Sequence, residues 1–343
     1  MPTATAGATD AASCRSCGTQ VAPALLSCPG CGTLTHGAAL NALAERAGED
    51  ERAGELARAA ATWREALALL PASAPQRAAV VARVDDLTRR IDAAPAAPPS
   101  SRGGRAGANR GVWGTISAAA LLLLTKAKLL LLGLTKVSTL FSMLAFLGVY
   151  WKLYGWALGA GIVASIYVHE MGHVAALARY GISAGAPMFI PGLGAFVRLK
   201  QSPASAREDA VVGLAGPLWG LGAAAAAYAM FAATGRGVWA AIAGLGALIN
   251  LFNLTPVWQL DGARGFRALS RRQRWAVAAA CAAAALVSTQ GILWIVALVG
   301  AYRAFESKDA PATGDPRLFA TFVGLVAAHA AIVVATASAA HVR

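Results

Sequence analysis

The feature that most constrains this chain is a pair of histidines within a long apolar run. His169, Glu170 and His173 form the pattern His-Glu-x-x-His, and the apolar run around them covers residues 155–178. A helix of that length crosses a bilayer. Because histidines and carboxylates are costly to place in lipid, we expect these residues to have a functional reason for their position. The sequence therefore predicts a membrane-spanning helix that carries a polar site.

The spacing of the two histidines is typical of a zinc site. Residues four apart lie on one face of a helix, so His169 and His173 can fill two corners of a tetrahedral site. Glu170 lies next to the first of them, where it can act as a general base on a water molecule. The alternative, a coincidence in a core helix, leaves three polar groups in lipid without a reason. We expect both histidines to be zinc ligands and Glu170 to be the catalytic base.

The composition places the chain among integral membrane proteins. Of its 343 residues, 57% are hydrophobic and 14% are charged. A soluble globular domain has roughly 25% charged residues, so the soluble classes fit poorly. The net charge of +13 lies largely in short segments beside apolar runs, as in cytoplasmic juxtamembrane loops. Nucleic-acid binding, the rival explanation of this charge, is not expected because no basic helix is interleaved with aromatic residues.

Four of the five cysteines lie near the N-terminus in two Cys-x-x-Cys pairs. Residues 1–12 have neither a basic segment nor an apolar core, so we expect no signal peptide and a cytoplasmic N-terminus. Reducing conditions there favour metal binding over a disulfide, and one pair would be enough for a redox motif. The spacing predicts a structural zinc ribbon at residues 12–36. Its expected ligands are Cys14, Cys17, Cys28 and Cys31.

Three further domains follow from periodicity and composition. Residues 37–92 have a helical pattern and predict a soluble hairpin of two or three short antiparallel helices. Within them, residues 63–71 resemble the second helix of a tetratricopeptide unit, although a generic helical hairpin fits the pattern as well. Residues 93–111 are rich in Pro, Ala, Ser, Gly and Arg and predict a flexible linker. Residues 112–341 form the predicted membrane-embedded domain.

That domain is predicted to be a polytopic α-helical fold of about six or seven spans. Between the histidine helix and the next span, residues 187–200 alternate like strands and predict a small β-hairpin near the active site. Such a hairpin offers an edge to which an extended substrate can pair. Besides the histidine helix, the expected spans are residues 135–151, 210–232, 238–260 and 318–339, with one or two more in 275–305.

A catalytic zinc site needs a third protein ligand. Asp261 ends the expected 238–260 span, and a carboxylate at membrane depth is a functional candidate. The arginine-rich segment 264–274 follows at once and indicates that this end is cytoplasmic. The histidine helix then runs from outside to inside, so that His169 and Asp261 lie at similar depth. We therefore expect Asp261 to supply the third ligand.

Three motifs together resemble the site-2 protease family of intramembrane zinc metalloproteases. They are His-Glu-x-x-His at residues 169–173, Ala-Gly-Pro at 215–217, and Asn-x-x-Pro-x-x-x-Leu-Asp-Gly at 253–262. The resemblance implies that His169, His173 and Asp261 bind zinc and that Glu170 is the base. It also implies that Asn253 contacts the substrate or its oxyanion.

The resemblance covers residues 155–267 and departs from many family members in the soluble part. Many members carry a PDZ module, but the loops at 180–208 and 233–238 are too short for one. The soluble part here is instead the N-terminal zinc-ribbon-like head. A PDZ-based selection of substrates is therefore not expected.

The expected activity is that of a zinc metalloendopeptidase that hydrolyses peptide bonds of transmembrane proteins. It would use one catalytic and one structural zinc ion. We expect an integral protein of a bacterial inner (cytoplasmic) membrane, with a transmembrane protein substrate and a cytoplasmic protein partner of the head. Two alternatives remain: a catalytically silent membrane adaptor that recruits a partner through its head, and a metal-handling membrane protein. Glu170 favours the protease, because neither alternative needs a base there.

Overall fold

The computed structural model describes residues 12–94, 137–190, 194–199, 201–288, 290–306 and 308–341. The chain divides into two units, Met1–Ala96 and Ala97–Arg343. The expected linker, apart from its first two residues, and the lysine-containing segment 112–136 lie outside the described residues.

The N-terminal unit begins with two short turns that contain the cysteine pairs. β1 (Ala12–Ser13) pairs with β2 (Gln20–Val21) in antiparallel fashion across the first turn. An isolated antiparallel bridge between Ser27 and Leu34 closes the second turn. Three helices follow, α1 (Gly37–Arg52), α2 (Leu56–Ala68) and α3 (Pro75–Ala93).

The three helices pack through small apolar residues. Ala47, Ala59 and Ala60 are fully buried, as is Leu87 of α3, and small side chains allow the helix backbones to approach closely. Trp63, in the segment that resembles a tetratricopeptide helix, donates a hydrogen bond of 2.9 Å from Nε1 to a carboxylate oxygen of α1. The segment 37–92 is thus three consecutively packed helices. Whether they are a tetratricopeptide unit stays a prediction.

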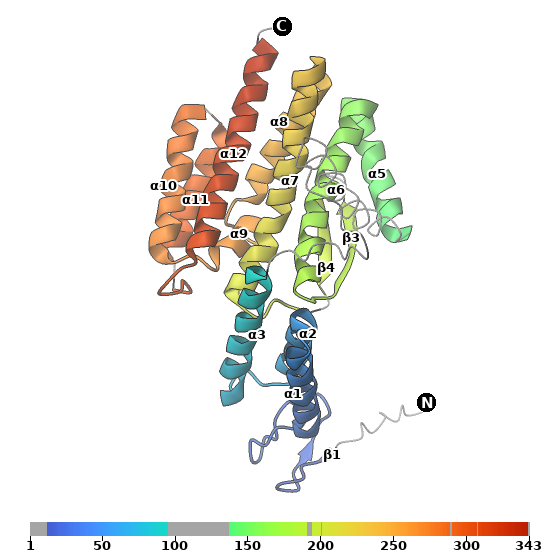
Figure 1. Cartoon of the computed structure of the whole chain (residues 1–343), viewed down its shortest axis with the longest axis vertical. Helices are drawn as coiled ribbons and strands as arrows, with labels where there is room; N and C mark the ends of the chain where they lie inside the picture. Colours follow the sequence, from blue (N-terminus) through green and yellow to red (C-terminus); the bar gives the residue numbers. More distant parts are fainter. Residues whose placement is uncertain are drawn as a thin grey trace, which may run out of the picture. The chain divides into compact units, whose positions relative to one another are not determined.

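The described part of the second unit is mostly helical and contains a two-stranded sheet (Figure 1). Its longer helices run side by side in the view of Figure 1, and the hairpin β3–β4 lies beside α5 and α6. In chain order the elements are α5 (Val137–Tyr154), α6 (Trp156–Arg179), β3 (Ala184–Ile190), β4 (Gly194–Leu199), α7 (Ala206–Thr234), α8 (Gly237–Asn253), α9 (Asp261–Phe266), α10 (Arg271–Ser288), α11 (Gly291–Phe305) and α12 (Pro316–His341).

Among the described residues, three helices are long and apolar enough to cross a membrane: α6, α7 and most of α12. Three more helices are apolar but shorter, namely residues 139–154 of α5, α8 and α11. The segment 275–305, expected to hold one or two spans, is divided between two helices, α10 and α11. The chain is therefore an integral membrane protein with several apolar helices.

The apolar residues of this unit face both inward and outward. One buried cluster contains residues of all helices from α7 through α12, including Leu251, Phe266 and Phe322. A second cluster joins α5, α6 and Phe189 of β3. Other large apolar side chains point away from the protein, including Phe141 at 74% exposed and Val287 at 87% exposed. Apolar surface of this extent is unusual in a soluble protein but is what lipid tails would cover.

The hairpin expected at residues 187–200 is present as β3 and β4. Phe189 of β3 faces Ala195 of β4, and the register shifts between Ala184 and Pro187. Phe189 is buried and stacks with Tyr167 of α6, with ring centroids 6.3 Å apart. The hairpin is therefore anchored on the helix that carries the two histidines.

One expectation was wrong: the span that begins near residue 238 does not continue to residue 260. α8 ends at Asn253, and Asp261 is the first residue of the separate short helix α9. Pro256 lies between them, and a proline has no N–H for the helix and disfavours helical geometry at the preceding residue. Asp261 therefore lies at a helix start after an irregular segment, and not within a continuous span.

α7 has clear signals at both of its ends. The Ser205 hydroxyl accepts a hydrogen bond from the Glu208 N–H, and the Glu208 side chain accepts one from the Ala204 N–H. This resembles a capping box, except that Glu208 reaches the N–H of the residue before the cap. Gly235 ends the helix in the left-handed region, at φ 65°. These signals fix the register of the helix that lies against the histidines.

Candidate metal centre

Three side chains from two helices meet at one buried point. His169 and His173 lie one turn apart on α6, and Asp261 begins α9. The two Nε2 atoms are 3.1 Å apart, and they lie 3.1 Å and 3.3 Å from the two carboxylate oxygens of Asp261. All three residues are less than 10% exposed. The structure thus brings together the three ligands expected for a catalytic metal.

The hydrogen bonds on the far side of each ring decide which nitrogen faces this point. His173 Nδ1 lies 2.8 Å from the backbone carbonyl oxygen of Val212, which can only accept, so Nδ1 carries the proton. His169 Nδ1 lies 2.8 Å from the side-chain oxygen of Asn250, and the same reasoning applies. Both Nε2 atoms then present lone pairs towards Asp261. This tautomer is the one that an Nε2-bound metal requires.

The donor set fits a zinc ion. Three acceptor atoms at these separations need a positive charge among them, since burial removes the water that would otherwise solvate them. A tetrahedral zinc ion with bonds of about 2.0–2.2 Å holds its nitrogen and oxygen ligands about 3.3–3.5 Å apart. The observed separations lie close to this range. Two imidazoles and a carboxylate also leave a fourth position for a reactant, as catalytic sites require.

Glycines on α6 and α7 make room for the centre. A Cβ on Gly216, in the middle of the Ala-Gly-Pro motif, would lie 2.2 Å from His173 Nε2 and 2.7 Å from His169 Nε2. A Cβ on Gly172 would lie 2.4 Å from the carbonyl oxygen of Ala215. The two helices therefore cross at van der Waals distance beside the ligand atoms. Any larger residue at Gly216 would fill the space in which an ion would bind.

Ion pairs hold α9, and with it Asp261, against α7. Asp209, in the first turn of α7, lies 2.8 Å from Arg264 Nε and 2.9 Å from Arg267. A Cβ on Gly213 would lie 2.7 Å from the Arg264 Cβ, so the two helices touch at that position. Arg274, only 1% exposed, donates to the carbonyls of Phe266 and Leu269, at and just beyond the C-terminal end of α9. These contacts fix the C-terminal half of the short helix.

The three candidate ligands, His169, His173 and Asp261, border a cavity of about 1050 Å³. Glu170, 5% exposed, lines this cavity beside the histidines. Asn253 lines it as well, and its Nδ2 lies 3.5 Å from His169 Nε2. Arg264 and Arg267 also border the cavity. All five residues expected at the catalytic site from the sequence therefore surround one space.

The sequence reasoning missed two groups at this site. Asn250 and the Val212 carbonyl orient the two histidines. A backbone carbonyl leaves no trace in a sequence. Asn250 did leave a signal, since it is a polar residue inside the apolar run of α8, which is costly in lipid. Arg264 and Arg267, which the sequence marks only as positive charges on the cytoplasmic side, also border the cavity.

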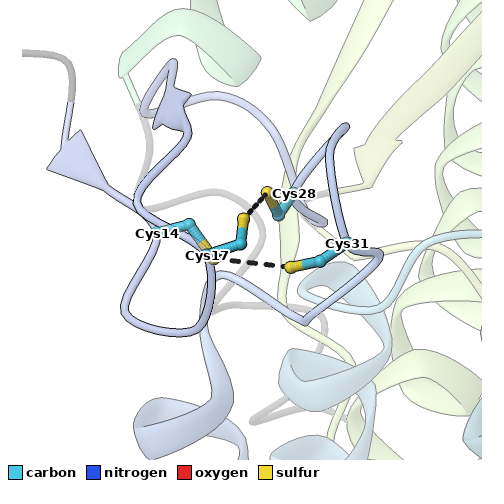
Figure 2. A group of neighbouring side chains, drawn as sticks. All are labelled: Cys14, Cys17, Cys28 and Cys31. Carbon is cyan, nitrogen blue, oxygen red and sulfur yellow. Dashed lines mark hydrogen bonds between the residues drawn. The ribbon is translucent and has the colours of Figure 1, made fainter.

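The second candidate metal site is the four-cysteine cluster of the N-terminal unit (Figure 2). Its sulfur atoms point towards one another and all lie within 4.8 Å of each other. Cys14 Sγ is 3.7 Å from Cys31 Sγ, and Cys17 Sγ is 3.5 Å from Cys28 Sγ. A tetrahedral zinc ion with Zn–S bonds of about 2.3 Å separates its sulfur ligands by about 3.8 Å. The cluster therefore fits zinc.

The two cysteine turns have the same backbone geometry. Gly18 and Gly32 each follow the second cysteine of a pair, with φ of 74° and 73°. Each glycine N–H donates a hydrogen bond of 2.9 Å to the carbonyl of the first cysteine of its own pair. The left-handed conformation favours glycine because a Cβ would be strained there. Each turn thus presents two thiols on one side.

The metal-free cluster has unequal thiols. Hydrogen bonds from the hydroxyl and the backbone N–H of Thr19 hold the pKa of Cys17 at about 6. A hydrogen bond from the backbone N–H of Ser16 lowers the pKa of Cys14, whereas burial raises the pKa of Cys28. Because the thiolate is the form that binds metal, Cys17 is the thiol readiest to capture an ion.

This inequality predicts an order of alkylation in metal-free protein. Because pH 7 is above the pKa of Cys17, this thiol is largely in the thiolate form at that pH. Iodoacetamide should therefore modify Cys17 before Cys28, whose pKa is raised. Peptide mapping by mass spectrometry after short exposures gives the order. Zinc should protect both residues. Equal rates for the two cysteines without zinc, or no protection by zinc, would contradict this account of the cluster.

Comparison with known proteins adds one match. The family model described as "Peptidase family M50" matches residues 157–237, which include His169, Glu170, His173 and the Ala-Gly-Pro motif. Asp261 lies beyond the matched residues. No match was found among curated proteins or among solved structures. Over residues 157–237 the chain therefore carries a domain of peptidase family M50, the site-2 protease family.

Proposed function

We propose that this protein is an intramembrane zinc metalloprotease that cuts peptide bonds of transmembrane substrates. The observation that carries the proposal is the convergence of His169, His173 and Asp261 on one buried point that opens into the cavity lined by Glu170. The helix α6 that carries three of these residues is long and apolar enough to cross a membrane. The match to a peptidase family supports the same activity.

Each residue of the site has a role in this reaction. Zinc, when bound, would activate water and polarise the scissile carbonyl. The Glu170 carboxylate would take a proton from the attacking water and give it to the nitrogen of the leaving amine. Asn253, whose amide Nδ2 lies beside the metal-binding atoms, would donate a hydrogen bond to the carbonyl oxygen as it gains charge.

The substrate would reach the site as an extended segment, because a peptide bond in a regular helix is shielded by its own backbone. The hairpin β3–β4 supports this idea, since it packs against α6 and offers strand edges. An extended segment that adds to a strand edge satisfies its backbone hydrogen bonds without water. The cavity beside Glu170 is large enough for a short peptide segment.

We further propose a structural zinc ion at the four cysteines and a cytoplasmic location of the N-terminal unit. Free thiols persist in a reducing compartment, and the arginines beside α9 and α10 fit the cytoplasmic side of a bacterial inner membrane. The head would then meet a cytoplasmic protein partner. About six spans in this arrangement combine the three long helices with the three shorter apolar ones.

The first test removes only the base. The Glu170→Gln variant keeps the shape of the side chain but cannot accept a proton, so peptide cleavage should fall by about 10²–10⁴-fold. Zinc content, measured by mass spectrometry of purified protein, should stay at the wild-type level. The exposed carboxylate Glu45 provides the control, since Glu45→Gln should leave cleavage unchanged. If Glu170→Gln cleaves at the wild-type rate, the base must be another residue. If the unaltered protein binds zinc but cleaves no peptide, a metal-handling role would be favoured over the protease.

The second test concerns the third ligand. Asp261→Asn keeps the shape but removes the negative charge that offsets the ion, so zinc should bind more weakly and cleavage should fall to near background. Asp261→Glu keeps the charge and should retain part of the zinc. Zinc titration of both variants gives the comparison. Wild-type affinity and cleavage in Asp261→Asn would mean that the third ligand lies elsewhere.

The third test addresses topology. A reporter enzyme that is active only outside the cytoplasm, fused near residue 100, should give no signal, because the head is expected to stay inside. The same reporter fused in the short connection between α7 and α8 provides the positive control, since that end of α7 lies opposite the arginine-rich end. Strong activity of the residue 100 fusion would reverse the proposed orientation.

A further inference from the structure

We propose that Asn250 is a positioning residue that makes His169 an Nε2 ligand and so sets the zinc affinity of the membrane centre. The inference rests on the proposed zinc site and adds a residue that neither the expected motifs nor the matched family segment contains. Asn250 lies in α8, a helix that supplies none of the three metal ligands. It is 2% exposed.

Two hydrogen bonds fix the orientation of the Asn250 amide. Its Nδ2 donates to the backbone carbonyl of Gly246, one turn earlier, at 2.8 Å. A carbonyl can only accept, so the amide nitrogen must face Gly246 and the amide oxygen must face His169. Oδ1 then accepts from His169 Nδ1 at 2.8 Å. The oxygen has no hydrogen to give, so the imidazole proton is held on Nδ1 and the lone pair on Nε2.

The packing of α7 has a gap that fits this amide. A Cβ on Gly220 would lie 2.2 Å from Asn250 Oδ1 and 2.5 Å from its Nδ2, closer than real contacts allow. Two residues along the same helix, a Cβ on Gly222 would meet nothing within 4 Å. The absence of a side chain at Gly220 is therefore what allows the amide to lie between α7 and α8.

The two histidines differ in how they are oriented. His173 is held by a backbone carbonyl, which no side-chain substitution removes. His169 depends on a side chain from another helix. One turn further along α8, Asn253 approaches the opposite nitrogen, with Nδ2 3.5 Å from His169 Nε2. α8 thus contacts both nitrogens of the His169 ring, and the Asn250 contact is the one that leaves Nε2 free for a metal.

Loss of the Asn250 oxygen should weaken the metal site without removing a ligand. The proton of His169 would no longer be held on Nδ1, and the ring could turn or change tautomer. Substitution of groups that orient metal-bound histidines typically lowers metal affinity by about 10–100-fold. We expect a loss of that size, with all three ligands still present.

The experiment measures zinc affinity in the full-length chain. Cys14→Ser and Cys17→Ser are present in every sample, so that the membrane centre alone is titrated against a competing chelator. Asn250→Leu removes the acceptor at similar size. Gly220→Ala leaves Asn250 in place but displaces its amide, and Gly222→Ala is its matched control on the same helix. Asn250→Asp tests rescue, because a protonated carboxyl can donate to Gly246 and still accept from His169.

The proposal expects Asn250→Leu and Gly220→Ala to raise the zinc dissociation constant about 10–100-fold, and Gly222→Ala and Asn250→Asp to stay near the parent. If Gly220→Ala and Asn250→Leu both bind zinc with the affinity of the parent chain, the proposal is overturned. An equal loss in Asn250→Asp and Asn250→Leu also overturns it, since a merely structural role predicts no rescue. If Asn250→Leu does not fold, the comparison of zinc affinity between Gly220→Ala and Gly222→Ala decides whether the proposal holds. A parent chain that binds no zinc refutes the proposed function itself.

Discussion

The membrane unit depends on one electrostatic constraint: three electron-pair donors converge where water cannot solvate them. The Nε2 atoms of His169 and His173 and the carboxylate of Asp261 lie within about one hydrogen-bond length of each other and are buried. Such an arrangement is unfavourable unless a cation lies among the donors. The surrounding helices can therefore be understood by how they hold these donors in place and leave room for an ion.

The neighbouring helices do this by different means. α7 approaches α6 closely because Gly172 and Gly216 have no side chains, and it provides a backbone carbonyl to His173. α8 provides the amide that orients His169. The ion pair between Asp209 and Arg264 ties α9 to the start of α7. Close packing by small residues and a buried polar network are the means by which helices associate where lipid weakens the hydrophobic effect.

In the N-terminal unit, the four-cysteine cluster bears on the stability of the fold. That unit has few large buried side chains, and its helices pack mainly through alanines. A small domain of this kind would gain stability from a metal ion that crosslinks its two turns. The two glycine-containing turns place the thiols of each pair on one side, and the low pKa of Cys17 favours the thiolate needed for metal binding.

The sequence by itself determined the ligand types and their local geometry. The spacing of His169 and His173 fixes them on one helix face, and the cysteine spacing fixes each pair in one turn, because both depend on short stretches of backbone. The tertiary structure decided which residues far apart in the sequence come into contact. It brought Asp261 to the histidines from a separate helix and not from the expected long span, since Pro256 ends the helical geometry in between. It also placed Asn250 and the Val212 carbonyl behind the two rings, contacts between distant segments that no local pattern encodes.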